Sequence, residues 1–564
     1  MPALFTFFKN IQLTANQLII IVCCYVVFIL NIPFLSETFN AITALDEYSI
    51  GFLLSVPLFL LSLTLIFISA FALRFLLKPF LIFIVLSSAM IFYASLTYGV
   101  IFDYGMVQNT VETDSAEALT YINFYALFFV ALFGGAPAFA IAKVKITYAP
   151  LLKDISQRLK VITASIVITG IIASLYYSDY AAVGRNNRIL TKYITPFSAL
   201  VSTYKYSRNN YFAPPLAFTL LDTTPTLANE NNQKSVTVLV VGETARANNF
   251  SLNGYNRNTN LFTEKYPLVS FENMTSCGTA TAVSVPCMFS RVSKNNYNKR
   301  LATSQQNVLD IARLSGVDVL WVDNNSSCKG VCKRVETIKI DPSANNLNCD
   351  GKYCFDEVLL KPLKEKLATL THSNTLIVLH MIGSHGPTYY RRYPKKSAQF
   401  LPDCQRSDIQ NCSQEALLNT YDNTIAYTDF VLSKIIQQLE GASRQHDINT
   451  NMLYVSDHGE SLGENGVYLH GLPYVIAPKE QTHIPMLFWQ SNSEQGSQAS
   501  VDETCLQANT AQAYSHDNIF DSVLGLLSIK SSVYNKSNDV FSWCKPGAVL
   551  ARENVSINKN QHIQ

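Results

Sequence analysis

Four short motifs, far apart in the chain, carry the side chains that metal-assisted phosphoryl chemistry needs. They are VGET at Val241–Thr244, CGTAT at Cys277–Thr281, GSHGPT at Gly383–Thr388 and SDHGES at Ser456–Ser461. Each places a carboxylate, an imidazole or a hydroxyl beside a glycine or at the end of an expected strand. Such a set could bind a divalent metal and a phosphate group together. The motifs therefore predict a zinc-dependent transferase of phosphoryl groups.

The elements that must position these side chains are short, β-branched runs separated by amphipathic stretches. The runs are Val236–Val241, Asp318–Val322, Thr375–His380, Asn451–Ser456 and Ile484–Trp489. Residues Leu417–Leu439 have the periodicity of a helix. Alternation of buried strands with helices is typical of an α/β domain, in which helices cover both faces of a mainly parallel central sheet.

Three of the candidate side chains directly follow two of these strands. Ligands of open α/β sheets gather at the carboxyl ends of the strands. We therefore expect Glu243, Asp457 and His458 to meet at one sheet edge. Two carboxylates and an imidazole are suitable zinc ligands, and they leave a fourth position for a hydroxyl that reacts.

The reacting hydroxyl is expected in the loop between Cys277 and Cys287, which a disulfide would hold rigid. Thr281 fits best as both the fourth ligand and the nucleophile. Zinc lowers the pKa of bound water from 15.7 to about 7, and it would favour a threonine alkoxide in the same way. The spacing leaves three rival hydroxyls open, and these are Ser276, Thr279 and Ser284.

Apolar residues are concentrated in the first third of the chain. The protein has 564 residues, of which 48% are hydrophobic and 15% charged, too apolar a balance for a wholly soluble protein. Five runs approach the roughly 20 residues that a membrane-spanning helix needs. They lie near Gln17–Leu35, Ile50–Leu73, Phe80–Phe102, Tyr121–Ala142 and Val161–Tyr177. Residues 1–177 are therefore predicted to form a transmembrane domain of five helices.

The loops between these runs fix the orientation of the helices. Basic residues such as Arg74, Lys78 and Lys145 alternate with acidic loops that contain Glu37 and Glu112. Because basic loops stay in the cytoplasm, the N-terminus is cytoplasmic and the chain after the fifth helix lies outside. We expect residues 178–232 to form a linker with helices at the membrane surface, and residues 233–564 to form the catalytic domain.

Ten of the twelve cysteines lie in this outer part and come in couples, as expected of disulfides in an oxidising compartment. The expected pairs are Cys277 with Cys287, Cys328 with Cys332, Cys349 with Cys354, Cys404 with Cys412, and Cys505 with Cys544. The alternative is a zinc ribbon built from the second and third pairs. The formal net charge of +2 gives no reason to expect a nucleic-acid partner.

The motifs resemble those of the lipid A phosphoethanolamine transferases, which include the mobile colistin-resistance enzymes and belong to the alkaline phosphatase and sulfatase superfamily. The resemblance rests on five segments. They are VGETARANNFSLNGY at Val241–Tyr255, CGTATAVSVPCMFS at Cys277–Ser290, CKGVC at Cys328–Cys332, GSHGPTYYRRYP at Gly383–Pro394 and SDHGESLGENGVYLHG at Ser456–Gly471. The fold it implies is an alkaline-phosphatase-like domain in the periplasm, attached to helices in the bacterial inner membrane.

The resemblance also implies roles for particular residues. It selects Thr281 as the nucleophile and, with Glu243, Asp457 and His458, as a zinc ligand. His385 and His470 match positions that bind the phosphate or a second zinc ion, so one or two ions are expected. Lys329 and Asn325 match positions near the phosphoryl group. Asn109, Thr113 and Glu117 are four residues apart, so on one helix they would form a face for the ethanolamine headgroup.

The expected reaction moves phosphoethanolamine from phosphatidylethanolamine to a phosphate of lipid A, through a threonine intermediate. The product carries less negative charge and would reduce sensitivity to polymyxins such as colistin. We expect a monomer. Two alternatives stay open at this point. One is transfer of another headgroup such as glycerol phosphate, and the other is a membrane receptor with an inactive hydrolase fold.

Overall fold

The computed structural model describes residues 12–45, 47–113, 115–228, 234–344, 346–370, 374–491 and 501–545. The chain forms two compact units. One consists of Met1–Gln108 and Ile122–Ala213, and the other of Asn109–Tyr121 and Pro214–Gln564. The expected boundary between residues 232 and 233 lies outside the described residues.

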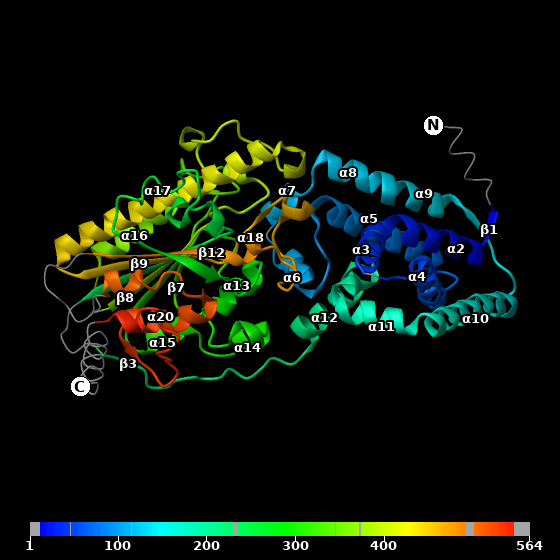
Figure 1. The fold of residues 1–564 in the computed structure, drawn as a ribbon, viewed down its shortest axis with the longest axis horizontal. Coiled ribbons are helices and arrows are strands. Elements are labelled where there is room, and N and C mark those ends of the chain that lie inside the picture. The colour runs from blue at the N-terminus through cyan, green and yellow to red at the C-terminus, as the bar shows by residue number, and fades with distance from the viewer. Residues whose placement is uncertain are drawn as a thin grey trace. The chain divides into compact units, whose positions relative to one another are not determined.

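The first unit is built of long apolar helices. Four are long and apolar enough to cross a membrane, and a bent pair of helices makes up to five among the described residues. The four are α4 at Ile50–Phe71, α5 at Leu77–Tyr98, the α8–η2–α9 segment at Phe124–Lys143, and α10 at Leu151–Leu175. In Figure 1 the helices labelled α2 to α5 and α8 to α12 belong to this unit, whereas α7 (Ser115–Thr120), also drawn in blue, belongs to the second unit.

The first expected span is broken. Its two parts, Ala15–Leu30 and Ile32–Thr43, meet at an angle of 59°. Proline lies in the first turn of the second part and cannot continue the helix before it. At the break, the amide of Asn31 donates to the carbonyl oxygens of Val26 and Thr195 at 2.9 and 2.8 Å. The side chain thus replaces backbone hydrogen bonds that the bend removes.

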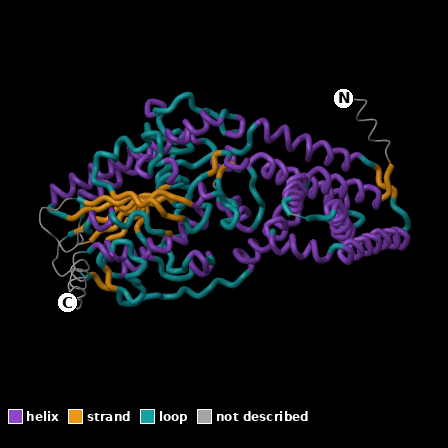
Figure 2. The backbone as a smooth tube through the Cα atoms, in the orientation of Figure 1, coloured by secondary structure: helices purple, strands orange, loops and turns teal. Residues whose placement is uncertain are grey.

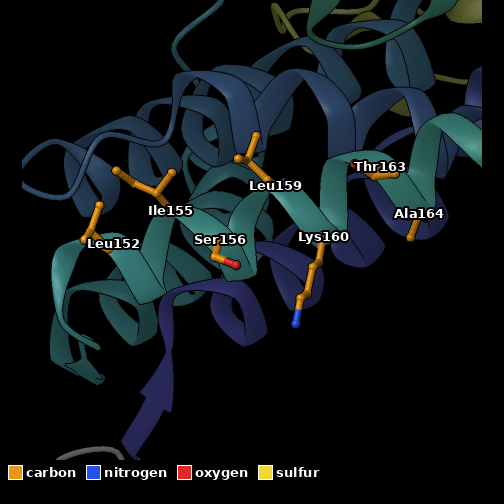
Figure 3. Close-up of a pocket in the computed structure, with 7 residues that line it drawn as sticks. All are labelled: Leu152, Ile155, Ser156, Leu159, Lys160, Thr163 and Ala164. Atoms are coloured by element: carbon orange, nitrogen blue, oxygen red, sulfur yellow. The ribbon is translucent and has the colours of Figure 1, made fainter.

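Helix α10 begins at Leu151 rather than near Val161, where its apolar run starts. Its first turns are amphipathic, and Figure 3 shows Leu152, Ile155 and Leu159 beside Ser156 and Lys160 along a groove of this helix. Long basic side chains can cover apolar surface with their stems while the charge stays in water. The helix therefore begins earlier than hydropathy indicates, with an amphipathic segment before the membrane-spanning part.

The second unit has an eight-stranded sheet at its centre, coloured orange in Figure 2. Its strand order is β13-β5-β12-β9-β4-β8-β6-β7. Strand β12 is antiparallel to β5 and β9, and the other pairs are parallel. The bounds are β4 Ser235–Gly242, β5 Val269–Thr275, β6 Asp318–Asp323, β7 Glu336–Lys339, β8 Asn374–His380, β9 Asn449–Ser456, β12 His483–Gln490 and β13 Tyr514–Ser515.

Helices cover both faces of this sheet. Figure 1 shows α16 (Leu360–Ala368) and α17 (Gln414–His446) on one side, with α15 (Val308–Leu314) and α20 (Ile519–Leu526) on the other. The central strands β4 and β8 are buried on both faces, and their middle residues are therefore mainly apolar. This confirms the expected α/β class. The five runs predicted as strands are β4, β6, β8, β9 and β12.

Five disulfides close loops in the second unit. They join the pairs that the cysteine spacing predicts, including Cys328 with Cys332 and Cys349 with Cys354, which the zinc-ribbon alternative would have used. A sulfur atom in a disulfide is not available as a thiolate ligand. The zinc ribbon is therefore excluded in this structure.

Substitution of Leu239 tests how far the core of the sheet stabilises the site at its edge. Leu239 is fully buried in β4, so Leu239→Ala should lower the free energy of unfolding by about 2–5 kcal/mol. Thermal unfolding of the full chain in detergent measures this. Leu314→Ala is the matched control, because Leu314 is 46% exposed and should cost little. Equal losses in the two variants would contradict the packing described for β4.

Candidate metal centre and active site

Three acidic or imidazole side chains meet where two neighbouring strands end. Strands β4 and β9 pair in parallel with Gly242 opposite Ser456, so the next residues, Glu243 and Asp457, emerge side by side. Glu243, Asp457 and His458 are fully buried, and one ligand atom from each lies within 4.8 Å of the others. The structure thus brings the three expected ligands together.

The surrounding hydrogen bonds fit this cluster to a cation. The Nδ1–H of His458 can donate to the carbonyl oxygen of Gly459 at 2.8 Å, so Nε2 faces the cluster and could bind a cation once it loses its proton. The Oδ1 atom of Asp457 accepts from the backbone N–H groups of Thr244 and His458. Its Oδ2 atom is buried and has no hydrogen-bond partner among the described residues. A buried carboxylate oxygen left in this way suits a metal ion.

The pKa shifts of the residues in the cluster also indicate a cation site. Although burial opposes the charged imidazolium, the carboxylates of Asp457 and Glu243 raise the pKa of His458 to about 10. Burial and the charge of Glu243 raise the pKa of Asp457 to about 7. The cluster therefore retains a proton that offsets two buried carboxylates. A divalent cation would displace that proton, so metal binding releases protons into solution.

Thr281 is the hydroxyl that contacts this cluster. It is the first residue of α13 (Thr281–Met288), and its Oγ1 atom lies 3.1 Å from both carboxylate oxygens of Glu243 and 3.4 Å from Nε2 of His458. The Cys277–Cys287 disulfide encloses it. The positive end of the helix dipole favours negative charge at this oxygen.

The rival hydroxyls have other surroundings. Ser276 donates to the carbonyl oxygen of Gly278 and Thr279 to that of Leu472, each at 2.6 Å. Ser284 follows one turn later in α13, with its hydroxyl buried and without a partner among the described residues. Ala280 is the N-cap residue of α13 and provides no side-chain cap. Of the four candidates, Thr281 has the contacts that a metal ligand needs.

Asn325 and Lys329 follow β6 and differ in what they touch. The amide of Asn325 donates to Oε2 of Glu243 at 2.7 Å and to the carbonyl oxygen of Met381 at 2.9 Å, so it orients a ligand of the cluster. The ammonium of Lys329 donates instead to Ser326 at 2.9 Å and to the backbone oxygen of Glu112 at 3.3 Å.

Two further histidines lie beside the cluster. The ring of His470 is 4.6 Å from that of His458 and 5.5 Å from that of His385. Nδ1 of His470 lies 3.4 Å from Oε2 of Glu460, a buried carboxylate that the sequence analysis missed although it stands in the SDHGES motif. Burial lowers the pKa of His385 to about 3, so this imidazole is neutral. These side chains form a second, mixed group of potential ligands.

The segment Asn109–Tyr121 belongs to the same unit as this site. Oε1 of Glu117 lies 3.5 Å from Nε2 of His385. Asn109, Thr113 and Glu117 do not share one helix, because α6 (Tyr104–Glu112) ends before Thr113 and α7 (Ser115–Thr120) begins after it. The hydroxyl of Thr113 donates to the carbonyl oxygen of Asn109 at 2.6 Å, a local bond that competes with continuation of the helix. The prediction that these three residues line one face of a single helix is therefore wrong.

An ion pair that the sequence analysis missed attaches this segment to the rest of the unit. The ammonium of Lys299 lies 2.7 and 2.6 Å from the two carboxylate oxygens of Glu112. Burial lowers the pKa of Lys299 despite the attraction of Glu112. The sequence offers no signal for a pair so far apart along the chain.

Comparison with known proteins identifies the class. Residues 235–529 match the family model described as sulfatase, and residues 60–211 match the model described as phosphoethanolamine transferase EptA/EptB. A likeness to the integral membrane lipooligosaccharide phosphoethanolamine transferase A from Neisseria meningitidis has a TM-score of 0.87 at 36% identity and covers 95% of this chain and 100% of that one. The fold and site thus define a membrane-attached enzyme of the sulfatase class.

Two curated relatives make the assignment more specific. The chain is 39% identical to the phosphoethanolamine transferase EptA of Escherichia coli K12, over 95% of this chain and 98% of that protein. It is 35% identical to the phosphatidylethanolamine transferase Mcr-1 of Escherichia coli, over 88% of this chain and 93% of that protein. The chain belongs to the phosphoethanolamine transferase family. It is a multi-pass protein of the bacterial inner membrane with its catalytic domain in the periplasm.

Substitution of Gly383 tests how closely the backbone packs against Glu243 in the candidate metal centre. Its φ is +49°, and a Cβ atom there would lie 2.6 Å from the carbonyl oxygen of Glu243. Gly383→Ala should displace this ligand and lower metal affinity about 10- to 100-fold, measured by chelator competition. Gly316→Ala is the control, because Gly316 also has a positive φ but open space around it. Equal metal affinities in the two variants would contradict the described packing.

Proposed function

We propose that this enzyme transfers phosphoethanolamine from phosphatidylethanolamine to a phosphate of lipid A, through a covalent intermediate on Thr281. The observation that carries the proposal is the contact of the Thr281 hydroxyl with Glu243 and His458 at the buried cluster. The relatives named as phosphoethanolamine and phosphatidylethanolamine transferases support the transferred group and its donor. A further relative, 29% identical over 56% of this chain, is named Kdo(2)-lipid A phosphoethanolamine 7''-transferase, which supports a lipid A acceptor.

Glu243, Asp457, His458 and Thr281 would hold one zinc ion. Carboxylate oxygen, imidazole nitrogen and a fourth oxygen position suit zinc. Gly459 and Asn325 already hydrogen-bond His458 and Glu243 and so orient these two ligands. When bound, zinc acts as a Lewis acid that lowers the pKa of the Thr281 hydroxyl. His385 and His470, with Glu460, offer nitrogen and oxygen atoms for a second ion or for the phosphate.

The chain's own residues account for both half-reactions. In the first, the Oγ1 atom of Thr281 loses its proton and attacks phosphorus, the bond from phosphorus to the diacylglycerol oxygen breaks, and that oxygen takes up one proton in exchange. In the second, an oxygen of a lipid A phosphate attacks the same phosphorus, the bond from phosphorus to Oγ1 breaks, and Oγ1 takes up a proton from water. His385, His470 and Lys329 donate hydrogen bonds to the non-bridging oxygens, since phosphoryl transfer depends mainly on positioning and electrostatics. Two half-reactions at one site give ping-pong kinetics.

Glu117 supplies the negative charge for the ethanolamine ammonium, with Asn109 and Thr113 nearby in the chain. Its carboxylate lies 3.5 Å from His385, a candidate phosphate ligand. Phosphate and ammonium are separated by only two carbon atoms in phosphoethanolamine. A carboxylate next to a phosphate-binding imidazole therefore matches the length of this headgroup.

The product explains a cellular effect. An added ammonium group reduces the negative charge of lipid A, which otherwise attracts cationic peptides to the membrane surface. We therefore propose that an active copy of this enzyme lowers sensitivity to polymyxins such as colistin.

Thr281→Ala should abolish transfer, with a loss of about 10³-fold or more, because the attacking oxygen is removed. Thr281→Ser keeps that oxygen and should retain measurable activity. Mass spectrometry of lipid A from cells carrying each variant measures transfer, and peptide mass spectrometry detects phosphoethanolamine on Thr281. Polymyxin sensitivity should return in the alanine variant alone. Normal lipid A modification by Thr281→Ala would refute the covalent scheme.

Glu117→Gln keeps the shape of the side chain and removes its charge. The Michaelis constant for phosphatidylethanolamine should rise about 10-fold, because a hydrogen bond to a charged group is lost. Initial rates at varied donor concentration in mixed micelles measure this constant. Glu336→Gln, on the exposed edge strand β7, is the charge-matched control and should behave as the wild type. An unchanged donor dependence in Glu117→Gln would remove this residue from the headgroup site.

A further inference from the structure

His516 connects the nucleophile loop to the strand that carries two of the metal ligands. It is buried, 1% exposed, at the start of the short helix η13 (His516–Asn518). Its Nδ1 atom lies 3.1 Å from the backbone nitrogen of Cys277. Its Nε2 atom lies 3.0 Å from the backbone oxygen of Ser456. One ring therefore contacts two segments that are far apart in the sequence.

The two partners fix the protonation of this ring. A backbone N–H can only donate, so Nδ1 accepts from Cys277. A carbonyl oxygen can only accept, so Nε2 carries the proton that it donates to Ser456. Burial lowers the pKa of His516 to about 3, which agrees with a neutral ring. With both nitrogens engaged and the ring enclosed, His516 has no free atom to exchange protons with a substrate.

The two hydrogen-bond partners of the His516 ring lie next to the residues that are proposed to react. Cys277 begins the disulfide-closed loop that leads to Thr281, and Ser456 directly precedes Asp457 and His458. Thr281 itself contacts Glu243 and His458, and two polar contacts of the residues before it go to other segments. Thr279 donates to the carbonyl oxygen of Leu472, and the N–H of Ser276 donates to that of Thr482. His516 thus joins the loop to the ligand-bearing strand itself.

The ring is in turn held by its own short helix. Ser515 and Asn518 form a reciprocal capping box around it. The carboxylate of Asp517 accepts from the N–H of Lys294, and the amide of Asn518 donates to the carbonyl oxygen of Asn538. These bonds restrain the helix on both sides. Loss of a hydrogen bond from the His516 ring therefore cannot be compensated by a shift of this helix.

We propose that His516 is a positioning residue that sets the separation between the Thr281 hydroxyl and the Asp457–His458 ligand pair. The inference rests on the proposed function, since it assumes that Thr281 reacts beside those ligands. It goes beyond that proposal by assigning control of the reacting geometry to a side chain that touches neither substrate nor metal. Displacement of reacting groups by about 1 Å can reduce a rate about 10²-fold.

Three substitutions separate the two halves of the bridge. In His516→Asn, the amide oxygen can occupy the Nδ1 position and keep the bond to Cys277. In His516→Gln, the amide nitrogen can occupy the Nε2 position and keep the bond to Ser456. His516→Leu has neither. If both bonds are needed, all three variants should slow formation of the Thr281 adduct about 10- to 100-fold, with His516→Leu the slowest.

The measurement is a quenched time course of phosphoethanolamine on Thr281, using the full-length zinc-loaded enzyme with phosphatidylethanolamine in mixed micelles and no acceptor. It yields a rate constant and a final amplitude separately. A positioning role lowers the rate constant, leaves the amplitude per bound zinc near wild type, keeps the Michaelis constant for the donor within about twofold and leaves the shape of the pH profile unchanged. A purely structural role lowers the amplitude and leaves the rate constant unchanged, and that result would overturn the inference.

His483→Leu is the matched control. Its ring also has two hydrogen-bonding contacts, with the carbonyl oxygen of Glu272 at 2.7 Å and the side chain of Asn248 at 3.3 Å, but neither joins the nucleophile loop. Its rate constant should equal that of the wild type. Thr281→Ala run in parallel separates the two proposals. An inactive Thr281→Ala together with wild-type rates in the His516 variants would refute the positioning role alone, whereas an active Thr281→Ala would refute the covalent scheme.

Discussion

The site is built around two carboxylates, Glu243 and Asp457, that are buried side by side at a cost in free energy. Glu243 and Asp457 emerge from neighbouring strands because β4 and β9 pair in parallel and in register. Their mutual repulsion in a site without solvent must be offset by positive charge. Without a metal, the protonated imidazole of His458 supplies part of this charge, and a bound cation would take its place. The Thr281 hydroxyl, 3.1 Å from Glu243, lies in the same field, so a cation that relieved the repulsion would also favour negative charge on the Thr281 oxygen.

Much of this could be predicted from the sequence, because it depends on local patterns. Strands buried on both faces give unbroken apolar runs, and a ligand that directly follows a strand is placed by that strand. Strand β5 escaped recognition because it lies next to the edge strand β13, with Glu272 and Asn273 exposed in its middle. The bend at Asn31 and the start of α10 at Leu151 were missed because hydropathy measures apolar length and does not locate helix ends.

Other features depend on tertiary contacts that leave no local signal. Nothing near Lys299 in the sequence points to Glu112, and nothing near His516 points to Cys277 and Ser456. Glu460 was visible within a motif but became a candidate only when His470 was found beside it. Strand position predicted that Glu243, Asp457 and His458 would meet, whereas the choice of Thr281 among the hydroxyls rested on the family resemblance. The residues that hold them in place were revealed by the fold alone.

The grouping of Asn109–Tyr121 with the second unit has a consequence for modular use of this protein. A soluble fragment that began at Pro214 would contain Glu243, Asp457, His458 and Thr281. It would lack Glu117, which contacts His385, and Glu112, which contacts Lys299. Inhibitors selected against such a fragment would be optimised for a site without these two carboxylates. Ligand discovery for this enzyme is therefore better served by the full-length chain.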